Sequence, residues 1–200
     1  MKRNVLAVLA LAATLATAIS FTSAFAASHT EDNSDHAAMG GLGFRSSEAP
    51  IGVRWWFSKQ VALDAGVGFT SEKLNYSDIN GDPANESLTS FSVDLGVPFA
   101  LKTWDKVHFL LRPGFTYTSA DDIDLFIGTD GEFKEKRNTF SVTGEFELEV
   151  FLAKNASISA SHGAGFASTK LDIEGQESDT IFGTFGSNFT TLGFHVYLWQ

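Results

Sequence analysis

The stretch Ile51–Phe69 reads IGVRWWFSKQVALDAGVGF and contains two runs of alternating residues separated by Ser58–Gln60. In both runs one parity is wholly apolar: Ile51, Val53, Trp55, Phe57, Val61, Leu63, Ala65, Val67 and Phe69. The other parity is mostly small or polar and includes Arg54 and Asp64. Alternation on both sides of a tight turn predicts two antiparallel strands. A soluble sheet with an apolar core and a membrane barrel with an apolar exterior show the same alternation. This stretch alone therefore does not decide whether the apolar face points inward or outward.

Residues 1–26 have the features of a cleaved secretory signal peptide. Lys2 and Arg3 precede an apolar run over 5–18, and Ala24–Ala26 gives a small-residue cleavage pattern. That run is too short for a spanning helix, and no later segment approaches the roughly 20 apolar residues that one needs. Residues 27–37 are polar and aperiodic, which predicts a flexible stub. Any membrane association must therefore use strands of a domain over 38–200.

The exported chain is acidic and contains no cysteine. Removing Lys2 and Arg3 from the 14 basic residues leaves 12 against 24 acidic ones, so the formal charge is 12 − 24 = −12. This charge argues against nucleic acid as a partner. Without cysteine, disulfides, thiol catalysis and zinc–thiolate sites are excluded. We expect neither a cofactor nor a bound metal ion.

Eight segments alternate from residue 38 onward: 38–46, 50–57, 61–72, 87–101, 106–118, 138–153, 157–171 and 188–199. Most reach the 9 to 11 residues that a tilted spanning strand needs, although the second is short and the first is glycine-rich and weakly patterned. Tight turns alternate with long polar loops: the turns are 58–60, 102–105 and 154–155, and the loops are 72–86, 120–137 and 173–187. This rhythm predicts an all-β, eight-stranded antiparallel up-and-down barrel that crosses a membrane. The short connection at 46–49 departs from it.

The polar parity indicates a narrow interior rather than a surface that faces water. Lysines of the exported chain lie in turns, loops or strand ends, whereas the polar strand faces carry glycine, serine, threonine and isolated charges. Tryptophans lie beside short turns or at the C-terminus, as in an interfacial aromatic girdle: Trp55, Trp56, Trp104 and Trp199. The apolar faces are therefore predicted to face lipid.

Arg54 and Asp64 then point into the barrel, and the three-residue turn places them directly opposite each other. The same parity collects a predicted interior charge network: Arg54, Asp64, Asp94, Arg112, Glu145, Glu147 and Glu149, with His108 and His195. Unpaired charge is costly in a confined interior, so we expect ion pairs and water-bridged contacts. Side chains about fill an eight-stranded barrel, which predicts a polar plug. A narrow, low-conductance channel with an acidic lining remains an alternative.

Residues 38–200 resemble the small eight-stranded bacterial outer-membrane barrels, the family of the OmpA transmembrane domain and OmpX. The resemblance rests on the strand rhythm and on the last strand, Thr191–Trp199 (TLGFHVYLW), which is similar to the aromatic-rich assembly signal of these barrels. Here Gln200 follows the terminal aromatic residue. The resemblance implies recognition by the outer-membrane assembly machinery, contact with the lipid bilayer and a structural or surface-interaction role. Whether the loops bind an extracellular ligand is left open.

Two competing hypotheses are a lipid-modifying enzyme and a soluble, secreted, lipocalin-like binding barrel. Ser161 and His162 are the one suggestive catalytic pair, but adjacent strand residues point to opposite faces, so no catalytic residue is predicted. His162 lies on the otherwise apolar parity of its strand, and the alternation does not explain it. Asp78, Asn80 and Asp82 have the spacing of a calcium loop, but Pro83 replaces the expected glycine, so we expect a solvated turn. The loop 120–137 is acidic around an apolar centre, Leu125–Ile127.

Overall fold

The computed structural model describes residues 38–77, 83–124, 133–171, 179–184 and 190–199. The predicted signal peptide, the stub, the calcium-like spacing at 78–82 and the apolar centre of the 120–137 loop lie outside these residues. The described part of the chain is all-β. None of it forms a helix long and apolar enough to cross a membrane.

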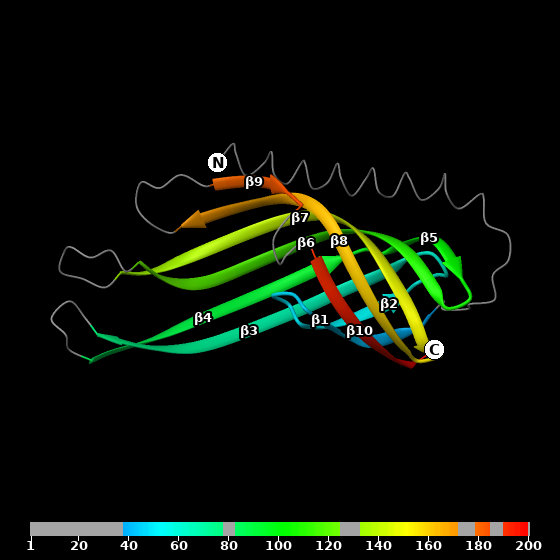
Figure 1. The fold of residues 1–200 in the computed structure, drawn as a ribbon, viewed down its shortest axis with the longest axis horizontal. Helices are drawn as coiled ribbons and strands as arrows, with labels where there is room; N and C mark the ends of the chain where they lie inside the picture. Colours follow the sequence, from blue (N-terminus) through cyan, green and yellow to red (C-terminus); the bar gives the residue numbers. More distant parts are fainter. Residues whose placement is uncertain (1–37, 78–82, 125–132, 172–178, 185–189, 200) are drawn as a thin grey trace.

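The described strands are β1 (Gly40–Arg45), β2 (Ile51–Trp56), β3 (Ala62–Ser77), β4 (Pro83–Gly96), β5 (Phe99–Trp104), β6 (Val107–Asp124), β7 (Phe133–Ala153), β8 (Ala156–Leu171), β9 (Asp179–Gly183) and β10 (Thr190–Trp199). β4 and β5 follow one another along β6, and β9 and β10 follow one another along β8, so each pair forms one interrupted strand of the barrel. β10 pairs with both β8 and β1. This closes the predicted eight-stranded antiparallel barrel (Figure 1).

The strand ends differ from the sequence prediction in two ways. The predicted strand 87–101 is broken at Val97–Pro98, where proline has no N–H for the ladder, and β5 then moves the tight turn to Asp105–Lys106. β3, β6 and β7 also extend into predicted loops, and β6 pairs with β7 as far as Asp124 and Phe133. These outer ends carry polar residues on both faces, so hydrophobic periodicity could not reveal them.

The register forms a continuous apolar circuit around the outside of the barrel. Starting on β6 and moving from partner to partner, the circuit passes Val107, Val150, Ile158, Phe194, Phe44, Ile51, Val67 and Val93, and returns to β6 at Tyr117. The return lies ten residues beyond the start (117 − 107), so the strands tilt by about 40°. Because parity is conserved around the circuit, a single face of every strand is lipid-like and its opposite face lines the interior.

The interior is closed at the tight-turn end by a cluster of buried apolar side chains. Its members come from the turn-proximal ends of five strands and from the residue before β1: Met39, Trp56, Ala62, Leu110, Phe151 and Tyr197. His108 packs edge-on against Trp56, with ring centroids 5.5 Å apart. We call these six residues the apolar seal. Trp56 was expected in the aromatic girdle, and that expectation is wrong: it is fully buried, because it shares the inward parity of Arg54.

Leu110→Ala should lower the free energy of unfolding by about 2–5 kcal/mol, because it leaves a cavity in the closely packed seal. Leu148→Ala, on the exposed outer face, should cost less, about 1 kcal/mol, because solvent or lipid fills the space. Urea unfolding followed by tryptophan fluorescence measures both. Equal losses would show that Leu110 does not point inward.

Candidate functional site: a charge network inside the barrel

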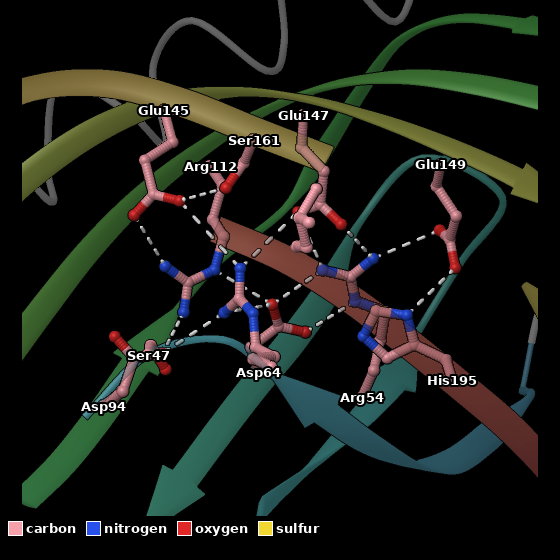
Figure 2. Close-up of polar contacts among 12 residues, drawn as sticks. Ser47, Arg54, Asp64, Asp94, Arg112, Glu145, Glu147, Glu149, Ser161 and His195 are labelled. Carbon is pink, nitrogen blue, oxygen red and sulfur yellow. Dashed lines mark hydrogen bonds and ion pairs between the residues drawn. The ribbon is translucent and has the colours of Figure 1, made fainter. Parts of the chain in front are cut away.

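Arg54, on β2, is the centre of the interior and is fully buried. Its Nε and Nη2 donate to the two carboxylate oxygens of Asp64 at 2.7 and 2.8 Å. A second fork runs from Nη1 and Nη2 to Glu147, at 2.9 Å each, and Nη1 also donates to Glu149 at 3.1 Å. The five N–H donors of the guanidinium therefore all reach carboxylates (Figure 2). As expected from the turn length, Arg54 pairs with Asp64 across β2 and β3.

Arg112, on β6, extends the network toward the loop end of the barrel. Its Nε donates to Asp64 at 2.9 Å and its Nη1 to Glu145 at 3.1 Å, while Nη2 donates to Asp94. Asp64 thus lies between two arginines. Together with Glu147 and Glu149, these contacts bring the seven residues of the sequence-derived network into one connected set.

Arg45 belongs to the network, although the sequence prediction did not include it. Its guanidinium lies 3.4 Å from Asp94, 3.6 Å from Asp64 and 3.9 Å from both Glu145 and Glu147. Its buried Nε has no hydrogen-bond partner. The signal was present: Arg45 shares the parity of Gly41 and Gly43, but that glycine-rich strand was too weakly patterned to assign a face.

Hydroxyl groups complete the hydrogen bonding of the two carboxylates at the ends of the network, Glu145 and Glu149. Glu149 accepts from Ser157 at 2.5 Å and from Tyr197 at 2.7 Å. Glu145 accepts from Thr143 at 3.1 Å and from Ser161 at 2.9 Å. Glu145 and Glu149 therefore each have neutral donors in addition to an arginine, which limits the free-energy cost of burying their charge.

Two glycines provide the space that the guanidinium of Arg112 occupies. A Cβ at Gly96 would fall on that guanidinium, and a Cβ at Gly114 would lie 2.8 Å from its Nη1. The small residues on the inward-facing parity thus leave the space that the long charged side chains fill.

Two small cavities lie beside the network in the described part of the chain. A cavity of about 20 Å³ lies between Arg45, Arg112 and the turn after β1, and one of about 10 Å³ lies beside His195 and Asp64. A water molecule needs roughly 10–15 Å³ of such volume, so each cavity holds about one. Neither is a conduit.

The network is joined to the apolar seal through Tyr197. Its hydroxyl donates to Glu149 and accepts a hydrogen bond from Trp56 Nε1 at 3.3 Å. His195 lies on the same side, buried, with Nδ1 3.6 Å from Glu149. The two layers therefore form one packed interior rather than separate compartments.

The remaining residues singled out in the sequence are placed as follows. Trp55 and Trp104 are exposed near the tight turns, and the side chain of Trp199 is not among those that the structure describes. Ser161 is buried against Glu145, whereas His162 is exposed on the outer face, with Nδ1 2.7 Å from the Thr190 hydroxyl. This pair is therefore split between the two faces. Within the described residues no group of three or more histidine and acidic side chains is arranged to hold a metal ion.

No protein-family model matches the sequence, and no curated protein matches it. Two solved structures are similar to the chain. The crystal structure of Acinetobacter baumannii CarO2 has 10% identity and a TM-score of 0.32, and covers 80% of this chain and 97% of its own. That of Acinetobacter baumannii CarO has 12% identity and a TM-score of 0.33, and covers 81% and 98%. At these scores the likeness supports no inference about this chain.

Arg54→Ala and Asp64→Ala should each destabilise the barrel, by roughly 3–5 kcal/mol where water does not enter. Arg54→Ala should cost more, because it leaves three carboxylates without their shared cation. The double variant should lose less than the sum of the two. Urea unfolding measures all three, and Lys102→Ala, at an exposed position, is the control, expected within about 0.5 kcal/mol of the parent. Additive losses would contradict the pairing.

Proposed function

We propose that this chain is an integral β-barrel protein of the bacterial outer membrane, with a structural or surface-interaction role and a lumen filled by its own side chains. The apolar circuit carries the proposal. Large hydrophobic side chains on it, such as Phe44, Ile51 and Val67, are about half exposed, while charged side chains are buried inside. This is the reverse of a soluble binding barrel and is the pattern that a lipid environment stabilises.

The filled interior supports a plug rather than a pore. The charge network occupies the middle of the lumen, and the apolar seal occupies its tight-turn end. An ion that crossed would have to displace both layers, and the two cavities beside the network hold about one water each.

Three finer parts of the proposal come from the sequence. Residues 1–26 act as the signal peptide, the C-terminal strand is recognised by the assembly machinery, and the chain is related to the OmpA and OmpX-like barrels. The loops at the far end carry any interaction with an extracellular partner.

In cells, the full chain should be recovered in the outer-membrane fraction and extracted by detergent. Because a closed barrel stays folded in cold detergent solution, its gel mobility should change on boiling. A soluble periplasmic protein of similar size is the fractionation control. Recovery with that control, without a heat-dependent shift, would overturn the membrane proposal.

In planar bilayers, the purified protein should show no steady conductance, because the charge network and the apolar seal occupy the lumen of the described strands. A general porin in the same chamber shows that open channels would be detected. Reproducible open steps of constant size would instead favour the narrow-channel alternative.

A further inference from the structure

The apolar exterior is uneven in height around the barrel. On β7 the outward residues from Leu152 to Phe140 include no polar side chain, whereas on β2 the outward apolar residues run only from Phe57 to Ile51. With a rise of about 3.3 Å per residue and a tilt of about 40°, these spans measure about 30 Å and about 15 Å along the axis. A transmembrane barrel usually carries an apolar band about 25 Å tall. The hairpin of β1 and β2 reaches little more than half of it.

The turn 46–50 does not complete the band, because it bends over the lumen. The Glu48 carbonyl accepts a hydrogen bond from Ser92 on β4, and its carboxylate accepts one from Thr118 on β6; both donors are at inward-facing positions. Ala49 is buried. Figure 1 shows β3, β4, β6 and β7 extending well beyond β1 and β2. Within the described residues, the outer surface above Ile51 is therefore a notch beside the taller β3.

The edge of this notch is polar. Ser46 accepts a hydrogen bond from the Leu192 N–H at 2.7 Å, which ties the end of β1 to β10. Thr190 is the next outward-facing residue of β10 toward the loop end, and it pairs with His162 on β8. His162 is the one outward-facing ionisable side chain between Ile158 and Phe166, and only β10 separates its strand from β1. The residue that the alternation left unexplained thus lies where the apolar band is interrupted.

We propose that the bilayer leaflet on the loop side is thinned at the β1–β2 hairpin, so that lipid headgroups and their water descend to Ile51 and His162. The inference rests on the proposed membrane insertion. A polar side chain is costly in hydrocarbon, and a bilayer can thin locally to match a short apolar span. Headgroups fit the notch better than a second barrel, because its edge offers hydroxyls and an imidazole, whereas a neighbouring barrel offers an apolar band.

The test uses two matched label positions in the otherwise cysteine-free chain. Ile51 and Phe146 are 56% and 55% exposed, and by the register they lie at about the same level along the barrel axis. Spin labels are attached to Ile51→Cys and Phe146→Cys in dioleoylphosphatidylcholine vesicles. Accessibility to a water-soluble nickel complex should be several-fold higher at residue 51, while oxygen accessibility should be higher at residue 146.

Equal, nickel-poor environments at both positions would overturn the thinning. Failure of membrane insertion gives a different result: lipid shields neither label, and adding vesicles does not protect the chain from protease. That outcome overturns the proposed function together with the inference that rests on it.

His162→Leu gives a second measurement. Ala160→Leu is the control, because it adds the same side chain on the same outer face. If His162 lies next to headgroups, the gain in the folding equilibrium constant caused by His162→Leu in the same vesicles should exceed the gain caused by Ala160→Leu by less than about tenfold. A larger gain would place His162 in full-thickness hydrocarbon and overturn the proposal.

Discussion

The interior of this barrel depends on one guanidinium group. Arg54 binds Asp64 and Glu147 through two forks and reaches Glu149 with its remaining donor. These contacts join β2 to β3 beside it and to β7 across the lumen. A planar group with five fixed donors can do this, whereas a lysine ammonium with three donors on a flexible stem cannot hold two forks. The glycine and serine positions around the network are small because its charged side chains occupy the space.

The network has more acids than bases, and their positions explain how the excess is tolerated. Three arginines face five carboxylates: Asp64, Asp94, Glu145, Glu147 and Glu149. The two most central carboxylates, Asp64 and Glu147, are bound by guanidinium groups. Glu145 and Glu149, further out, take part of their coordination from hydroxyl groups, which donate hydrogen bonds without adding charge. This keeps buried acceptors satisfied where a cation does not fit.

The alternation in the sequence was enough to predict the closed barrel and to place Arg54 opposite Asp64, because strand parity and turn length fix both. It was not enough for Arg45, which lies on a glycine-rich strand with too weak a pattern to assign a face, or for the strand ends, where both faces are polar. Trp56 shows two signals in conflict: its nearness to a turn favoured the rim, whereas its parity with Arg54 favoured the interior. Parity prevailed, because a strand residue cannot change face without a bulge.

The two interior layers depend on each other physically. Salt bridges hold a fixed geometry best where water is scarce, and solvent can approach the interior from the tight-turn end. The apolar seal lies at that end, between the solvent and Arg54, and Tyr197 belongs to both layers through its ring and its hydroxyl. A charged side chain in the seal would be hydrated from the rim and would draw water toward the network. The order of the layers, apolar at the rim and charged in the middle, is therefore the one that keeps bulk water at the tight-turn end away from the charge network.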